Sequence, residues 1–432
     1  MRLRLCSTAL FVLLAQQASA CAGLGKDHDS DIASVLNYVS RRSASTPDST
    51  LIENVRIFDG QVMMAPSTVL IRDGRIADID AGHGATASVV VNGTGKFLIP
   101  GLIDSHVHVD IPQALDAMAS YGVTTCVNMA CYDYELCETL KDIPGTTSMF
   151  TASLPAVGNG SFHARLRGSS SDLTVSASTN ATAWVATNAF PPGSPASFLK
   201  VTAEPDGPEQ GLLNDLVAAA HTLGRPATMH ASYVSAYEQA AIARPEIIQH
   251  LPADAVMNHS LARRLLRQKQ HVTATMAIFR IGANSAWLKT MLRQNFQWNV
   301  TMSNARILVE TGVPLLAGTD STNVGPLNVT FPYGLTLQCE LEYLVEAGMS
   351  PTQALRAATE DPSRVHNMYD RGIIYAGKRA DLVLLNSNPL LHIANTRDIS
   401  QVWVGGIPVQ NVTRDLTSDC AALDMVSNAY LS

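Results

Sequence analysis

The sequence predicts an α/β fold in which a (β/α)8 barrel carries a small β-sandwich domain built from N- and C-terminal strands. From Gly101 onward, short apolar strands alternate with helical stretches, which is typical of β/α units around a parallel sheet. Near both ends of the chain, short β runs instead follow one another, separated by Asp-Gly turns. Hydrophobic residues make up 46% of the 432 residues, enough for a large core.

Eight apolar segments are the expected barrel strands, and eight such β/α units close into a TIM barrel. Helices are expected between most of them, for example over 210–224 and 252–270. The strand segments are LIDSH (102–106), VTTCVNM (123–129), SMFTAS (148–153), SFLKV (197–201), PATMH (226–230), EIIQH (246–250), VTATM (272–276) and PLLAGTD (314–320).

The change of pattern divides the chain into domains. Residues 99–365 are assigned to the barrel, which is expected to end shortly after a helix over 351–360. The β runs of 49–98 form the first part of the β-sandwich, and 366–432 supply its second part and a C-terminal tail. Residues 21–48 are polar and weakly patterned, and we expect a leader or surface helix there.

Residues 1–20 have the pattern of a secretory signal peptide. Two arginines precede an apolar run over 9–14, and Ala-Ser-Ala at 18–20 is a suitable cleavage site. The run is too short to cross a bilayer, although a retained anchor and a lipidated Cys21 are alternatives. We therefore expect a protein of the secretory pathway, secreted and without a membrane span.

N-x-Ser/Thr sequons support secretion, because chance would give roughly half as many as the chain contains. They predict a glycoprotein, although each single match is weak evidence. The sequons begin at Asn92, Asn159, Asn180, Asn258, Asn299, Asn328 and Asn411.

The cysteines that remain after signal removal are even in number, as suits an oxidising compartment. Cys131 and Cys137 flank a short loop and could form a disulfide. Cys21 and Cys420, near the two ends of the chain, could form another. Cys126 lies inside an expected strand and is interpreted as a buried free thiol. No C-x-x-C spacing occurs, so a zinc site made of cysteines is not expected.

Four histidines and an aspartate are expected at one end of the barrel. His106 and His108 lie two residues apart on the first strand and therefore on one side of it. Active sites of such barrels lie at the C-terminal ends of the strands, where His230, His250 and Asp320 also lie. Each alone could be a core histidine or a helix N-cap, but together they predict a metal site. Asp320 could also exchange a proton with a metal-bound water.

These residues resemble those of the amidohydrolase superfamily of metal-dependent hydrolases. FLIPGLIDSHVHVD (97–110) is similar to the opening signature of the superfamily. Lys200 and the ligands on strands five, six and eight follow in the expected order. The segments over 350–365 and 372–390 match as well. In detail the sequence is most similar to the imidazolonepropionase-like branch, which includes Xaa-Pro dipeptidases and ochratoxin-hydrolysing amidases.

The resemblance implies an amidohydrolase that cleaves a carbon–nitrogen bond, amide or peptide-like, by attack of a hydroxide bridging two metal ions. The ions are divalent and expected to be Zn²⁺. His106, His108 and Asp320 would bind one ion, and His230 and His250 the other. Asp320 would carry the proton to the leaving nitrogen.

Lys200 would bridge both ions as a carbamate derived from CO₂. A buried lysine without a partner is rare, and two cations need an anionic bridging ligand. Because no Asp or Glu is expected at the active end of strand four, carboxylation of Lys200 would supply that anion. The alternative is a cationic Lys200 that binds a substrate carboxylate.

Two further residues are candidates for substrate contact. His163 follows strand three in GNGSFHAR, and in the resembling branch a histidine on this loop contacts the substrate carbonyl. We assign it a catalytic and substrate-binding role, with an exposed loop histidine as the alternative. Tyr233 could reach the substrate or only pack. The segment 154–196, rich in Ser, Thr, Gly and Pro, is expected to form a lid or pocket wall. Gln249 stands where the branch usually has Glu.

Other functions remain open at this stage. A mononuclear deaminase of the same superfamily needs no lysine on strand four, so Lys200 argues against it. A lactonase or phosphotriesterase could use the same site, and a binding protein with a vestigial site would be expected to lose ligands. The net charge of −7 and the absence of a dense Lys/Arg run argue against nucleic acid. We expect a small-molecule substrate as the partner, and leave a homo-oligomer open.

Overall fold

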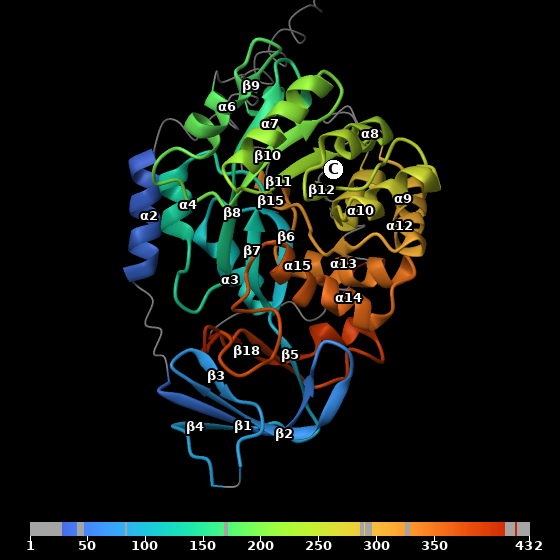
Figure 1. Cartoon of the computed structure of the whole chain (residues 1–432). Helices are drawn as coiled ribbons and strands as arrows, with labels where there is room; N and C mark the ends of the chain where they lie inside the picture. The colour runs from blue at the N-terminus through green and yellow to red at the C-terminus, as the bar shows by residue number, and fades with distance from the viewer. Residues whose placement is uncertain are drawn as a thin grey trace, which may run out of the picture.

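The fold class predicted from the sequence is confirmed by the computed structural model, which contains a parallel barrel sheet and a second sheet from both ends of the chain (Figure 1). The signal-peptide segment, Cys21, Asn328 and Asn411 lie outside the described residues. The structure describes residues 28–40, 47–82, 84–167, 172–285, 289, 296–324, 329–410 and 420.

The barrel consists of parallel strands in chain order around the axis, each overlapping one predicted segment. Backbone hydrogen bonds from Ser105 to Ala317 (N···O 3.0 Å) and from Asp320 to His106 (2.8 Å) close it. The strands are β6 (Leu102–His108), β7 (Val123–Asn128), β8 (Ser148–Gly158), β10 (Phe198–Ala203), β11 (Ala227–Ala231), β12 (Ile247–Gln249), β13 (His271–Thr273) and β14 (Leu315–Leu316). Beyond β14, β15 (Ser321–Val324) pairs with β6 and with β16 (Val329–Thr330).

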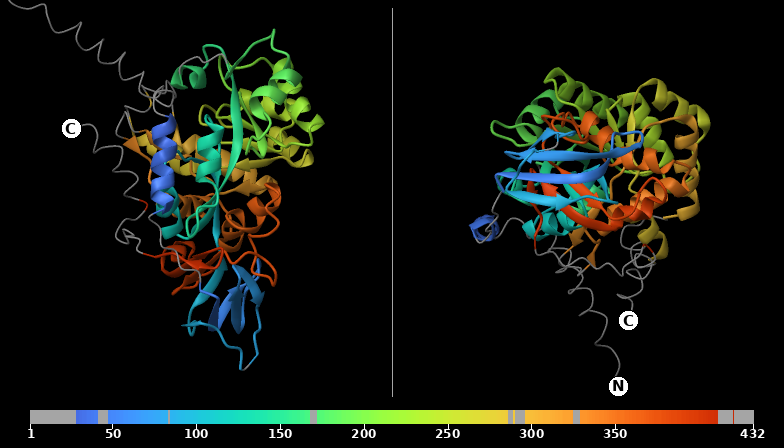
Figure 2. Two further views of the ribbon diagram at one scale, coloured as in Figure 1. Left: turned by 90° about the vertical axis from the view of Figure 1, so that its left-hand side faces the viewer. Right: turned by 90° about the horizontal axis from the view of Figure 1, so that it is seen from below.

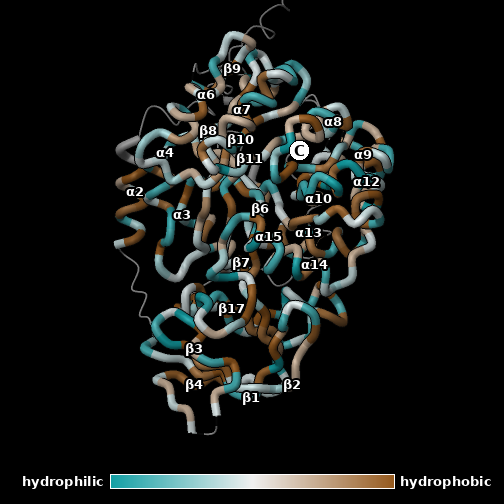
Figure 3. Tube along the Cα trace, in the orientation of Figure 1, coloured by the Kyte–Doolittle hydropathy of each residue, from teal (hydrophilic) through white to brown (hydrophobic). Residues whose placement is uncertain are grey.

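Helices cover the outside of the barrel, and hydrophobic and hydrophilic residues alternate along them (Figure 3). Their apolar sides share one buried core with the strands, since Leu115, Leu199 and Leu341 belong to the same cluster. The helices are α3 (Pro112–Ser120), α4 (Tyr134–Leu140), α7 (Gln210–Thr222), α8 (Val234–Ala243), α9 (His259–Arg267), α10 (Met276–Asn284), α12 (Trp298–Thr311), α13 (Leu335–Glu346), α14 (Pro351–Ala357) and α15 (Glu360–Val365).

The small domain is one curled eight-stranded sheet that joins the two ends of the chain. Antiparallel pairing of β5 with β17 makes this connection, and Ile52, Leu98 and Trp403 lie in its buried core. Because β5 leads directly into β6, the sheet lies at the N-terminal end of the barrel strands (Figure 1). Its strands are β1 (Ser49–Phe58), β2 (Met63–Arg72), β3 (Arg75–Asp78), β4 (Val89–Asn92), β5 (Phe97–Pro100), β17 (Leu382–Leu385), β18 (Ile399–Val404) and β19 (Ile407–Pro408).

The leader segment forms a surface helix, as predicted. This helix, α2 (His28–Ser40), packs beside α4 on the outside of the barrel (Figure 2). Val35 is buried in the contact, and the Tyr38 hydroxyl donates a hydrogen bond to the Asp116 carboxylate. Among the described residues, no helix is both long enough and apolar enough to span a membrane.

The expected lid segment contains more regular structure than its composition suggested. Strand β8 continues five residues past the predicted end at 153 and pairs with β9 (Thr174–Val175). The rest includes α5 (Phe162–Arg167), α6 (Ala181–Trp184) and a π-helix (Val185–Ala189). His163 therefore lies on a short helix that follows an extended barrel strand.

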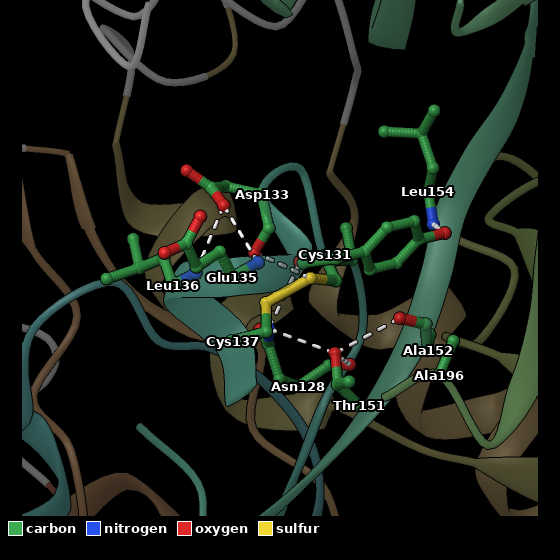
Figure 4. The surroundings of a disulfide bond; sticks show 12 residues. Asn128, Cys131, Asp133, Glu135, Leu136, Cys137, Thr151, Ala152, Leu154 and Ala196 are labelled. Carbon is green, nitrogen blue, oxygen red and sulfur yellow. Dashed lines mark hydrogen bonds between the residues drawn. A yellow bond between two sulfur atoms is a disulfide. The ribbon is translucent and has the colours of Figure 1, made fainter. Parts of the chain in front are cut away.

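The cysteine predictions are partly right. Cys131 and Cys137 form a disulfide (Figure 4), and Cys126 is a buried free thiol, both as predicted. The pairing of Cys420 with Cys21 is wrong, because Cys420 is bonded to Cys339 on α13. The position of Cys420 near the end of the chain did not predict its disulfide partner, because Cys420 lies against the side of the barrel. Arg397 and Glu342 also contact its sulfur there.

The sequon asparagines within the described residues are all exposed, so glycosylation at these positions remains a prediction. Two of them have structural roles, because Asn180 and Asn258 accept hydrogen bonds as the N-caps of α6 and α9. The exposed asparagines are Asn92, Asn159, Asn180, Asn258 and Asn299.

Candidate metal centre

His106, His108 and Asp320 converge at the C-terminal end of the barrel. The two histidines come from β6, and Asp320 follows β14, which adjoins β6 at the barrel closure. Asp320 Oδ1 lies 3.2 Å from His106 Nε2 and 3.1 Å from His108 Nε2. One ligand atom from each residue lies within 4.8 Å of those of the other two, as a shared metal ion would require.

His230 and His250 lie beside this group. His230 is on β11 and His250 follows β12, and their ring centroids are 4.5 Å apart. The ring of His250 is also 4.7 Å from that of His106. Both His250 (φ 75°) and Asp320 (φ 59°) have left-handed backbone conformations, which non-glycine residues rarely adopt. Such strain costs about 1–3 kcal/mol and is common where a site demands a fixed geometry.

Hydrogen bonds fix the orientation of two of the imidazoles. The Gln249 amide donates from Nε2 to Thr228 Oγ1 (2.7 Å), so its Oε1 accepts from Nδ1 of His106 (2.8 Å). Nδ1 of His250 lies 2.8 Å from the hydroxyl of Thr275. Because each contact involves Nδ1, Nε2 of the same ring remains available to bind a metal ion. This arrangement is common around metal ions in proteins. Sequence reasoning noted Gln249 only as a departure from the branch.

Burial keeps His106, His230 and His250 neutral. It lowers the pKa of His106 to about 4, and it holds the pKa values of His230 and His250 well below the ordinary value. Burial also acts to raise the pKa of Asp320, but His106 and His108 outweigh it and hold that pKa well below the usual range. Neutral imidazoles and an ionised carboxylate are the forms that bind metal ions.

Lys200 lies inside this group of ligands. It is on β10, its residue is 3% exposed, and its backbone N–H donates to Ser153 Oγ (3.0 Å). Burial lowers the pKa of Lys200 to about 8, and the nearby carboxylates of Asp320 and Glu204 limit the decrease. A buried lysine with a lowered pKa is more reactive than an exposed one.

The prediction that strand four offers no acidic residue at its active end is wrong. Strand β10 runs two residues beyond the predicted end, to Ala203, and Glu204 follows it. Lys200, Thr202 and Glu204 alternate with a period of two, the signal that could have revealed this carboxylate. The Glu204 side chain is 3% exposed, and its Oε1 lies 3.0 Å from Nδ1 of His163.

The two candidate substrate residues lie on this side of the barrel mouth. The ring centroids of His163 and His230 are 4.4 Å apart. Together with Glu204 these two histidines form a group in which one metal-binding atom of each residue lies within 4.8 Å of the others. Tyr233, the N-cap residue of α8, is half-buried. Its pKa is raised by burial and by the charges of Glu204 and Asp254. His163 is thus joined to the centre, and Tyr233 lies next to it.

Two buried carboxylates that sequence reasoning did not single out support the ligand loops. Asp104 accepts hydrogen bonds from the backbone N–H groups of His106 and Thr319, both at 3.1 Å, and from the Thr319 hydroxyl at 2.8 Å. Glu340 on α13 accepts from the backbone N–H groups of Met276 and Ala277, which begin α10. These contacts hold His106, Thr319 just before Asp320, and the chain immediately after Thr275.

The side chains present fit divalent cations. Nitrogen and carboxylate oxygen atoms are the donors that Zn²⁺ and related metals take in hydrolases. Nδ1 of His230 is buried and has no hydrogen-bond partner among the described residues, as expected of an atom reserved for another ligand.

Comparison with solved structures and curated proteins agrees with this fold. A Xaa-Pro dipeptidase with bound methionine aligns with a TM-score of 0.71 and 18% identity, covering 84% of this chain and 100% of that one. The ochratoxinase of A. niger aligns with a TM-score of 0.65 and 17% identity, covering 85% and 96%. At these sequence identities, the similarity to the two solved structures shows a shared fold and nothing more. The adenine deaminase of Methylobacterium sp. (strain 4-46) is 24% identical over 388 residues, 80% of this chain.

The chain spans only part of its curated relatives, 59% of that deaminase and between 16% and 63% of others. The Amidohydrolase family profile, in contrast, matches residues 97–409, well over half of the chain. This match begins at β5 and includes every residue of the proposed centre. The chain therefore belongs to the amidohydrolase family.

Proposed function

We propose that this chain is a secreted hydrolase that uses two divalent cations to cleave a carbon–nitrogen bond of an amide or peptide-like substrate. The observation that carries the proposal is the convergence of metal-binding side chains at the catalytic end of a barrel. The residues concerned are His106, His108, Lys200, His230, His250 and Asp320.

The ligands divide between two positions. His106, His108 and Asp320 would hold the first ion, and His230 and His250 would hold the second. Lys200, as a carbamate, would bridge them. When bound, the two ions, expected to be Zn²⁺, supply Lewis-acid polarisation of the substrate carbonyl and lower the pKa of a water molecule.

Asp320 would move the proton in this reaction. Its carboxylate is ionised, because the neighbouring His106 and His108 overcome the effect of burial on its pKa. It can therefore accept the proton of the attacking water and donate it to the leaving nitrogen. His163, at the edge of the centre, would contact the substrate carbonyl, and Tyr233 would contact the rest of the substrate.

Secretion and the substrate class have separate support. The signal-peptide pattern of residues 1–20 and two disulfides in one chain favour an oxidising compartment. The names of the two solved structures, a Xaa-Pro dipeptidase and an ochratoxinase, favour amide or dipeptide substrates.

A screen of metal-loaded protein tests the proposal. We expect turnover of N-acyl amino acids or Xaa-Pro dipeptides, and about two transition-metal ions per chain by elemental analysis. Asp320→Asn should bind substrate analogues but lose turnover. Failure on every amide, with turnover of an aminopurine or a cyclic imine, would contradict the amidase proposal.

A mononuclear deaminase is the second candidate, and the match to adenine deaminases over most of this chain favours it. The buried Lys200 argues against it, because a one-ion deaminase needs no anionic ligand from strand four. A lactonase or phosphotriesterase would use the same centre and differ only in substrate. One ion per chain together with release of ammonia would support the deaminase.

A further inference from the structure

A second cluster of metal-binding atoms shares His230 with the proposed centre. It consists of His163 from α5, Glu204 after β10, and His230 on β11, whose ligand atoms all lie within 4.8 Å of one another. His163 Nδ1 is 3.0 Å from Glu204 Oε1, and the His163 and His230 rings are 4.4 Å apart. Three barrel segments thus bring two imidazoles and one carboxylate together.

The Glu204 side chain is held in place at this point. It is 3% exposed, and the backbone N–H of His163 donates to its Oε1 at 3.3 Å. Nδ1 of the neighbouring His230 is buried and has no hydrogen-bond partner among the described residues. A buried carboxylate beside such an imidazole nitrogen is suited to bind a cation.

We propose that His163 and Glu204 join His230 and His250 as ligands of the second divalent cation, a role that His163 would take in place of direct contact with the substrate carbonyl. The inference rests on the proposed two-ion function and adds ligands to it from the loop after β8. The second ion then has one carboxylate donor that does not depend on carboxylation of Lys200. Because His163 lies on α5, binding of the second ion would also fix the position of this helix.

The chain contains a matched control pair. His221 Nε2 lies 3.0 Å from Glu246 Oε1, the same distance as in the His163–Glu204 pair. Both side chains of the control pair are more than 40% exposed, and they lie on α7 and just before β12, at the other end of the strands. A general effect of breaking a histidine–carboxylate pair would therefore appear in both sets of variants.

The test measures metal binding directly. Full-length protein is stripped with a chelator and titrated with Zn²⁺ by calorimetry and with Co²⁺ by visible absorption. Native protein should bind two ions. Glu204→Gln and His163→Asn should keep the first ion, lose the Co²⁺ spectrum of the second, and weaken the second dissociation constant by at least about 100-fold. Glu246→Gln and His221→Asn should match the native protein.

The possible failures are distinguishable. Native protein that binds a single ion would overturn the two-ion function and this inference with it. Two ions bound with native affinity by both Glu204→Gln and His163→Asn would overturn the inference alone, and would show that Glu204 only anchors the loop carrying His163. Thermal unfolding of each variant checks folding, and the two variants change different segments, so a folding defect in one leaves the other as the test.

Discussion

At the scale of single residues, the centre depends on a lysine whose burial changes its chemistry. Lys200 is 3% exposed and faces imidazoles and carboxylates, with a pKa lowered to about 8. At pH 7 about a tenth of its side chain is therefore the neutral amine, the form that can react with CO₂. An ordinary exposed lysine would be almost entirely protonated.

Lys200→Ala should lose metal and activity together. Removal of the bridging anion leaves both ions with weaker binding, so we expect at least about a 100-fold loss of amide hydrolysis and fewer than two ions per chain. Elemental analysis and amide turnover measure both effects, with the exposed Lys141→Ala as the control. Full activity of Lys200→Ala without bicarbonate or a short-chain acid would contradict the carbamate.

Gln249 can be tested by two substitutions with opposite results. Gln249→Leu removes the acceptor for His106 Nδ1 and the donor to Thr228, so metal affinity should fall about 10–100-fold. It should also lower the free energy of unfolding by about 1–3 kcal/mol, because buried polar atoms lose their partners. Gln249→Glu, the residue usual in the resembling branch, should keep native metal affinity. Equal loss in both variants would contradict this role.

The ligands that could be predicted are those at the ends of strands. His106, His108 and Asp320 lie at the ends of short apolar runs that could be recognised in the sequence. Glu204 was missed because the end of its strand was placed two residues early, a boundary error that hydrophobicity does not correct. In the sequence, Gln249 could be identified only as a departure from the Glu that is usual in the resembling branch. Its role in orienting His106 depends on a contact between two strands that are far apart in sequence.

At the scale of elements, the packing of α15 against β10 buries a histidine that cannot remain charged. His366 ends α15, and its ring is 5.4 Å from that of Phe198 on β10. Its Nε2 is buried without a hydrogen-bond partner among the described residues. Burial, with a smaller effect of His271, lowers the pKa of His366 to about 3. This histidine lies near the other end of β10 from Glu204, away from the proposed metal centre.

This histidine predicts acid sensitivity. Its pKa is lower in the folded than in the unfolded chain, so its contribution to stability is full above about pH 6.5 and decreases as the pH falls toward 3. Between pH 7 and pH 5 the loss is about 2 kcal/mol. His366→Phe should remove that part of the pH dependence in denaturant unfolding, whereas His392→Phe, at an exposed position, should not. Parallel pH profiles for native protein and His366→Phe would contradict the prediction.

At the scale of the whole molecule, the described segments toward both ends of the chain are joined to the rest of the fold. Pairing of β5 with β17 joins the two halves of the small sheet, and this was predictable because both halves consist of short β runs. The return of the C-terminal tail to α13 was not predictable. Residues near Cys420 have no apolar period, and the bond to Cys339 spans 81 residues of sequence.

The two disulfides should differ in what they contribute to stability, because they close loops of different length. Loop-closure entropy gives at most about 4–5 kcal/mol for the Cys339–Cys420 bond and about 2 kcal/mol for Cys131–Cys137, which spans six residues. The double variant Cys339→Ser, Cys420→Ser should therefore unfold at lower denaturant concentration than Cys131→Ser, Cys137→Ser. Using double variants avoids leaving a single reactive thiol in either protein. The reverse order would mean that the tail contributes little to the folded state and that the short loop beside β7 is the more important constraint.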